Sequence, residues 1–442
     1  MNALTNSGNQ GSGRNRTVAP FLPLTTVMNV GLLTILAATS LFAADEERLA
    51  LALKAQTDFE RVFLSPAATL HDTNICIQTQ ASILPVATPE ELPLFHFRKG
   101  YCTLAAATIT HESGEFLQAA SEFDRAVESW AGRNAAFAKK RPPEPLPSAL
   151  PVLASIARLK AGKGDGKELA TAVAAHTCAG IIVPAERCEA ILTLGREWSG
   201  WLALSHDQVD EAARQFPAGS VWTNWAAAKQ AFRDRKYPEA VAAYRRAVDA
   251  WESQARAGDP PLLQRLAPPV DLSVAYTELG GAQFLAGDAS GAIASLNQAI
   301  RRDGTNARAL YLRGRARDAA GQSDAALADY SLASRNALAK GEDQAGEAHL
   351  YRGVSLYRRK DYAGAEDEFT NALNFDITPA SRADAVAWRR LAAVASGSCD
   401  AGRRYLEESL PATSPFFPRD EARKTISSCT ATRTAVLPEP VK

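Results

Sequence analysis

The apolar positions between Asp271 and Asp376 repeat in a fixed order. Three glycines mark the repeat, and they are separated by 34 and then 39 residues: Gly280, Gly314 and Gly353. Aligning them brings three further rows into register: Ala292, Ala326 and Ala365; Leu296, Tyr330 and Phe369; and Ala299, Ala333 and Ala372. Since a helical turn takes about 3.6 residues, these rows share one helix face, and the glycine falls on a preceding helix. The pattern predicts three helical hairpins.

The same rows predict how the hairpins stack. Small residues let the two helices of a hairpin approach closely, and the large row of Leu296, Tyr330 and Phe369 fills the seam between neighbouring hairpins. One hairpin alone could not bury that face, whereas a stack can. The predicted fold class is therefore all-α, with tandem helix-turn-helix repeats stacked into a right-handed superhelical solenoid.

These units resemble the tetratricopeptide repeat, a helix-turn-helix unit of about 34 residues. The first copy begins with Tyr276-x-x-Leu279-Gly280, and the others begin with Leu310-x-x-Arg313-Gly314 and His349-x-x-Arg352-Gly353. The proline that the family places after the second helix is missing, and Gly304 stands there after the first unit. The resemblance implies a non-catalytic scaffold that holds another protein or peptide, and it does not identify that partner.

Composition and periodicity divide the rest of the chain. We expect a signal peptide or membrane anchor over 1–44, followed by an N-terminal helical region with one repeat-like hairpin over 45–141. A proline-rich linker with degenerate hairpins then covers 142–219, and a repeat covers 220–253. A proline-rich insertion follows over 254–270, then three tandem repeats over 271–376, capping helices over 377–410 and an extended tail over 411–442. The capping helices are expected because the end of a repeat array needs a cover for its last apolar face.

The N-terminal segment predicts export. Basic residues at Arg14 and Arg16 precede an uncharged run from Thr17 to Ala44, which leads into acidic residues. Cleavage would release the protein into the periplasm. Without cleavage, the uncharged run is long enough to anchor the protein in the inner membrane, with the repeats facing the periplasm.

The cysteines fit the same compartment. All of them follow the apolar segment, and they form three local couples: Cys76 with Cys102, Cys178 with Cys188, and Cys399 with Cys429. An even number of cysteines in an exported chain predicts disulfides, and helical hairpins bring such couples close together. Buried free thiols are the alternative. A metal site is not predicted, because no C-x-x-C pair occurs and no histidine is suitably spaced.

Charge and motifs argue against other functions. The 49 basic and 49 acidic residues cancel, so the total charge indicates no nucleic-acid partner. The histidines are scattered, and no catalytic or cofactor-binding motif occurs, so neither catalytic residues nor a cofactor are predicted. An envelope enzyme, or an accessory acting on cell-wall or secreted polymers, remains the alternative. A deep pocket with two carboxylates of shifted pKa would favour it.

The resemblance also implies where a partner binds. In the tetratricopeptide family the first helix of each hairpin lines the concave face through fixed positions of the repeat. Here, the residues expected at these positions are Trp222, Trp225, Lys229, Arg308, Tyr311, Arg315, Tyr357 and Arg358. Aromatic rings and guanidinium groups suit interface hot spots, so we expect an extended or helical partner segment with acidic and apolar side chains.

Overall fold

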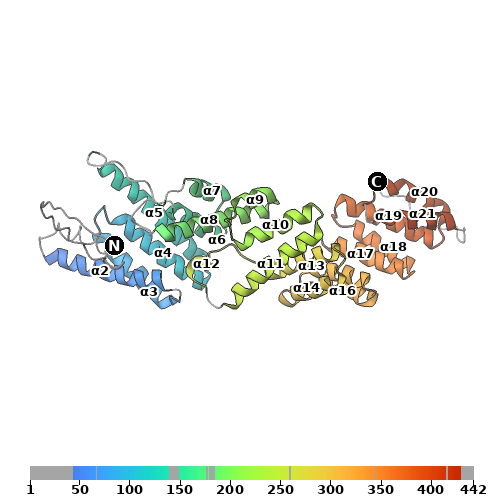
Figure 1. Cartoon of the computed structure of the whole chain (residues 1–442), viewed down its shortest axis with the longest axis horizontal. Helices are drawn as coiled ribbons and strands as arrows, with labels where there is room; N and C mark the ends of the chain where they lie inside the picture. Colours follow the sequence, from blue (N-terminus) through green and yellow to red (C-terminus); the bar gives the residue numbers. More distant parts are fainter. Residues whose placement is uncertain are drawn as a thin grey trace, which may run out of the picture.

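The computed structural model describes residues 43–429, apart from 66, 138, 140–148, 176–177, 179–184, 258–259, 343 and 415–416. The predicted export segment lies almost wholly outside the described residues, as does the end of the predicted tail. The described chain is an elongated stack of helices, with the N-terminal helices at one end and the C-terminal helices at the other (Figure 1). None of the described helices is both long and apolar enough to span a bilayer.

The helices follow one another as antiparallel pairs in most of the stack. The N-terminal half contains α2 (Ala43–Leu64), α3 (Leu70–Ile83), η2 (Leu84–Val86), α4 (Leu92–Thr110), α5 (Ser113–Phe137), α6 (Ala149–Lys160), α7 (Gly166–Ala174), α8 (Ala185–Ser205) and α9 (Val209–Gln215). The rest contains α10 (Val221–Arg233), α11 (Tyr237–Arg256), α12 (Leu262–Arg265), α13 (Leu272–Leu285), α14 (Ala289–Arg302), α15 (Ala307–Ala319), α16 (Ser323–Lys340), α17 (Gln344–Arg358), α18 (Tyr362–Leu373), α19 (Pro379–Ala395), α20 (Cys399–Ser409), η3 (Leu410–Ala412) and α21 (Arg419–Ser428).

Each predicted hairpin in the central stretch is present. α13 packs on α14, α15 on α16, and α17 on α18. The glycine of the first helix lies against the large residue of the second, so that a Cβ at Gly314 would come within 2.5 Å of the Tyr330 ring. Tyr330 and Phe369 are almost fully buried. The prediction of an all-α repeat solenoid is confirmed.

An ion pair recurs inside three hairpins, in the same place each time. A basic residue directly before the glycine meets an acidic residue directly before the seam aromatic. The nitrogen to oxygen distances are 2.8 Å for Lys99 with Glu122, 2.6 Å for Arg313 with Asp329, and 3.0 Å for Arg352 with Glu368. The ion pair therefore lies beside the contact between the glycine of the first helix and the aromatic ring of the second. Together the two contacts define the relative position of the two helices in these hairpins.

The proline-rich insertion is attached to the N-terminal helices. The side chain of Leu266 is fully buried, and its carbonyl accepts a hydrogen bond of 2.7 Å from Nε1 of Trp198 on α8. Nζ of Lys160 on α6 donates to the carbonyl of Arg265 at 3.1 Å. The short helix α12 contacts α4 and α8, and it lies among the N-terminal helices in Figure 1. The insertion thus ties two distant parts of the chain together.

The predicted disulfides are confirmed. Cys76 is bonded to Cys102, Cys178 to Cys188, and Cys399 to Cys429. The corresponding Cα–Cα distances are 6.2, 5.7 and 5.7 Å. The last bond holds the C-terminal helix α21 at the end of the array.

The C-terminal segment differs from the extended tail that we expected. Within it, residues Arg419–Ser428 form the helix α21. Its small apolar face, Ala422 and Ile426, is buried in the cluster that also contains Trp388 and Phe417. The sequence did not predict this helix, because the segment contains few apolar residues and only two residues of the helix face the core.

Candidate functional site

The inner side of the central stack is formed by the first helix of each hairpin. α13 contacts α15, and α15 contacts α17, whereas no comparable contact joins α14 to α16 or α16 to α18 in the described part of the chain. A stack whose first helices touch while its second helices spread apart curves with the first helices inside. The side chains of α13, α15 and α17 that point away from their partner helices therefore face the concave side.

Five side chains meet on this inner side, and we call them the inner-face cluster: Phe284, Arg308, Tyr311, Arg315 and Tyr351. The guanidinium carbon of Arg315 lies 4.9 Å from the ring centre of Phe284 and 4.1 Å from that of Tyr351. The rings of Tyr311 and Tyr351 stack, with centres 6.1 Å apart and planes 5° apart. Side chains from three consecutive hairpins thus form one aromatic and cationic surface.

The cluster presents hydrogen-bond donors at neutral pH. Burial raises the pKa of Tyr351 to about 12, although nearby Arg315 acts in the opposite direction. Burial likewise raises the pKa of Tyr311. Burial alone would lower the pKa of Arg308, but Glu278 more than compensates, so this pKa is raised. Both phenols therefore keep their protons, and the Arg308 guanidinium keeps its charge.

Arg315 is the member whose charge is least compensated. Arg308 has a carboxylate at 3.3 Å, that of Glu278. Among the described residues no carboxylate lies within ion-pair distance of Arg315, whose contacts are the two rings. A guanidinium in contact with two rings loses part of its freedom of movement, and its forked donors suit a carboxylate. This site can bind an anionic group.

Two of the predicted binding residues belong to the core instead. Trp222 and Trp225 are each 7% exposed. Trp222 stacks on Phe216 with ring centres 6.0 Å apart, and Trp225 lies edge-on to Tyr244 at 4.8 Å. Trp222 is covered by Phe216 at the end of α9, and Trp225 packs on α11 of its own hairpin, so the repeat register alone misplaced both on an open surface.

The other predicted residues separate into two groups. Arg308, Tyr311 and Arg315 lie together on α15 in the inner-face cluster. Tyr357 is 7% exposed, and its ring packs edge-on against Trp388 at 5.1 Å. Arg358 is exposed and lines a hollow beside α21, and Lys229 is half-buried on α10. The structure therefore does not bring Tyr357, Arg358 and Lys229 into the cluster.

Phe284 and Tyr351 were missed by the sequence analysis. Phe284 occupies in the first unit the repeat position that Tyr357 occupies in the third, so applying the same register there would have found it. Tyr351 precedes the glycine by two residues, a position outside that register. Tyr351 belongs to the cluster because the side chain of Arg315, on the preceding hairpin, extends to its ring.

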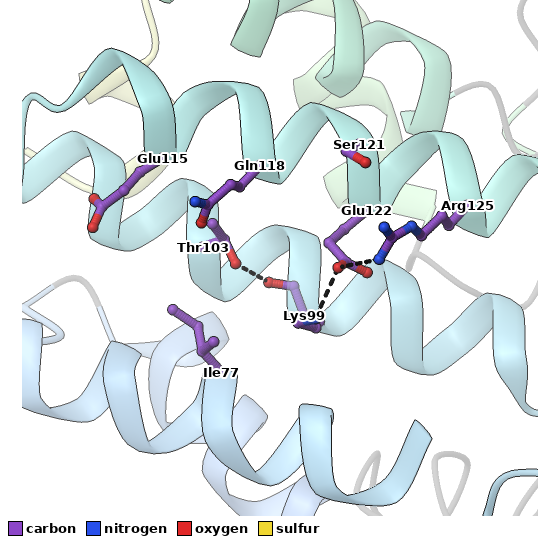
Figure 2. Close-up of a pocket in the computed structure, with 8 residues that line it drawn as sticks. All are labelled: Ile77, Lys99, Thr103, Glu115, Gln118, Ser121, Glu122 and Arg125. Carbon is purple, nitrogen blue, oxygen red and sulfur yellow. Dashed lines mark hydrogen bonds and ion pairs between the residues drawn. The ribbon is translucent and has the colours of Figure 1, made fainter. Parts of the chain in front are cut away.

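A pocket between α3, α4 and α5 contains two carboxylates, Glu115 and Glu122 (Figure 2). Burial opposes the ionisation of Glu122, but hydrogen bonds from His96 and Lys99 outweigh it and lower its pKa. Lys99 lies 2.8 Å and Arg125 3.1 Å from its Oε1. A general acid needs a raised pKa. Glu122 is therefore an ion-paired carboxylate that stabilises the hairpin, and this pocket does not favour the enzyme alternative.

The chain was compared with known proteins. No protein-family model matches the sequence, and no curated protein matches it. Among solved structures, yeast Tom70 is 12% identical, with 87% of this chain and 96% of that chain covered and a TM-score of 0.34. The TPR2AB domain of yeast Sti1, in a pHSP90 complex, is 16% identical over 69% and 98%, with a TM-score of 0.25. The C-terminal part of a TPR repeat-containing protein from Cytophaga hutchinsonii is 13% identical over 72% and 99%, with a TM-score of 0.26.

Identities and TM-scores this low say nothing about function. The class is defined by the hairpins of this chain, which recur after 34 and 39 residues and share the contact between a glycine and a large apolar side chain and the inner first helices described above. The described chain is an all-α helical repeat array whose hairpins resemble the tetratricopeptide repeat.

Proposed function

We propose that this protein is a non-catalytic scaffold of the cell envelope that binds a protein or peptide through the inner-face cluster. The observation that carries the proposal is Arg315, whose guanidinium lies against the rings of Phe284 and Tyr351 with no carboxylate at ion-pair distance in the described chain. Flat rings offer contact area at low entropic cost, and the guanidinium supplies directed donors. The expected partner segment carries a carboxylate beside an apolar side chain.

The envelope location rests on two features. Three disulfides are typical of oxidising compartments, where thiols are not kept reduced. The uncharged run with a basic flank at the N-terminus has the character of an export signal. Both features fit a scaffold that acts outside the cytoplasm, released or anchored through its N-terminal segment.

The test combines a charge reversal with loss of one ring, Arg315→Glu with Tyr351→Ala. Affinity capture from the envelope fraction, followed by mass spectrometry, is compared between the parent protein and this variant. We expect one captured protein to disappear with the variant and to be lost from the parent at high salt, because screening weakens ion pairs. The matched control is Arg423→Glu, a reversal at an exposed arginine on α21.

Unchanged capture by a correctly folded double variant would contradict the proposal. So would equal loss with the Arg423→Glu control, since that would indicate a general dependence on charge. Folding is checked by circular dichroism and thermal unfolding, because Tyr351 also packs against Tyr311.

A further inference from the structure

A further hollow lies where the proline-rich insertion returns to the stack. It is enclosed by α8, the turn before α10, the end of α11 and the insertion itself, and its volume is about 640 Å³. This volume falls within the range of about 300–1,000 Å³ that is typical of small-molecule sites. The inner-face cluster contributes no residue to its lining.

The described residues of the lining are mostly apolar and include one ionisable side chain. Trp222 and Trp251 form part of the wall, together with Leu194, Leu263 and other apolar side chains. Among the described residues of the lining, Glu197 on α8 is the only one that can carry a charge. A hollow of this composition can hold an apolar body and offer it one charged contact.

Glu197 has spare capacity to accept hydrogen bonds. Its Oε1 accepts a hydrogen bond of 2.6 Å from Oγ of Ser220. Within the described chain no lysine, arginine or histidine lies within ion-pair distance of it. Burial raises the pKa of Glu197, and the hydrogen bond from Ser220 reverses only part of that effect. A half-buried carboxylate without a counter-ion is costly, and a ligand that brings a cation would remove this cost.

We infer that this hollow is a binding site for a small molecule with an apolar body and a primary ammonium group. The ammonium donates to Glu197, which has free lone pairs, and it is attracted to the neighbouring tryptophan rings. The apolar body fills the space between α8 and the insertion. This charge preference is opposite to that of the inner-face cluster, so the two sites have different ligands and can be tested separately.

Ser220 has a structural role that the test must preserve. Its Oγ accepts from the backbone N–H of Trp222 at 3.3 Å and so caps α10, while it donates to Glu197. Glu197→Gln keeps an oxygen acceptor for Ser220 and removes the charge. Glu189→Gln is the matched control, since Glu189 is an exposed carboxylate on the same helix and does not line the hollow.

The probes are 2-phenylethylammonium, the neutral 2-phenylethanol and the anionic 3-phenylpropanoate. Binding to the disulfide-bonded protein is followed by calorimetry and by tryptophan fluorescence, because Trp222 and Trp251 line the hollow. We expect saturable binding of the ammonium probe and about tenfold weaker binding of the alcohol, as a charge-assisted hydrogen bond is lost. The carboxylate probe should bind more weakly than both.

Protonation provides an independent readout in the parent protein. Ammonium affinity should fall as the pH is lowered through the raised pKa of Glu197, since the neutral acid no longer attracts a cation. Alcohol affinity should stay constant over the same range. Glu197→Gln should bind ammonium and alcohol alike, and Glu189→Gln should behave as the parent.

Three outcomes would overturn the inference. These are the absence of saturable ammonium binding to the folded parent, equal affinities of the parent for ammonium and alcohol, and an unchanged ammonium preference in Glu197→Gln. If Glu197→Gln fails to fold, the probe comparison and the pH profile of the parent decide the question without it.

Discussion

Gly353 of α17 lies directly against the ring of Phe369 on α18, and a Cβ at Gly353 would come within 2.6 Å of that ring. Real Cβ atoms do not approach other atoms so closely, so the ring or the helix would have to move. The same relationship joins Gly314 to Tyr330. Close helix approach at these glycines therefore sets the geometry of the hairpins, and through it the position of the inner-face cluster.

Gly353→Ala should destabilise the protein. The added methyl group overpacks the contact with Phe369, which costs about 1–3 kcal/mol of unfolding free energy. The matched control is Gly132→Ala in α5, where a Cβ would meet nothing within 4 Å. This control should be neutral or stabilising, because alanine favours a helix over glycine by about 0.5–1 kcal/mol. Urea unfolding measures both, and equal stabilities of the two variants would contradict the packing described here.

The sequence predicted the central hairpins well because their packing is periodic. Gly353 and Phe369 recur with their counterparts at a fixed spacing, and such spacing is visible without coordinates. The ion pair between Arg313 and Asp329 was not predicted, although it recurs too. Its members have the same spacing as the glycine and aromatic pair, but a charged residue in a helix is as compatible with solvent as with a partner, so the spacing alone did not indicate an ion pair.

Asp329→Asn should cost much more than the loss of an ordinary surface charge. Asp329 is 3% exposed and receives Arg313 and Arg317 at 2.6 and 2.8 Å. Its neutralisation leaves two half-buried guanidinium groups without a counter-ion, which we expect to cost about 3 kcal/mol. Asp420→Asn, which removes an exposed partner of Arg423, should change stability by less than about 0.5 kcal/mol. Thermal and urea unfolding measure the stability of both variants. A loss of stability in Asp329→Asn no larger than that in Asp420→Asn would refute the role of Asp329 as a buried counter-ion.

Stability on the acid side should depend on Glu122. Burial would raise its pKa, but hydrogen bonds from His96 and Lys99 lower it below the ordinary value of 4.5. A carboxyl with a depressed pKa in the folded state stabilises the protein above its ordinary pKa, and this contribution is lost as the pH falls through the folded value. Glu122→Gln should therefore be less stable near neutrality and lose less stability between about pH 5 and about pH 3.

The measurement for Glu122 is urea unfolding across the acid range. The control is Glu128→Gln, which removes an exposed carboxylate from the same helix and should leave the slope as in the parent. Parallel stability curves for Glu122→Gln and the parent would show that Glu122 titrates alike in the folded and unfolded states.

Less of the candidate site than of the fold could be predicted. Arg315 was found because the repeat register places it on the inner face, but the same register also selected Trp222 and Tyr357. Their burial depends on helices outside the regular array, namely α9 for Trp222 and α19 for Tyr357. Periodicity describes a repeat unit between identical neighbours. It does not show where a helix outside the repeats covers the surface of a unit.

The disulfide between Cys399 and Cys429 should control the order of α21. It closes a separation of 30 residues, for which loop entropy gives a stabilisation of about 3.5 kcal/mol. α21 buries little else than Ala422 and Ile426, so its own packing is weak. In Cys399→Ser with Cys429→Ser we expect faster amide exchange in α21 and a lower melting temperature. Cys178→Ser with Cys188→Ser should lower the melting temperature too, because a bond is lost, while leaving exchange in α21 unchanged. Unaltered protection of α21 after loss of the Cys399 bond would show that packing alone holds this helix at the end of the array.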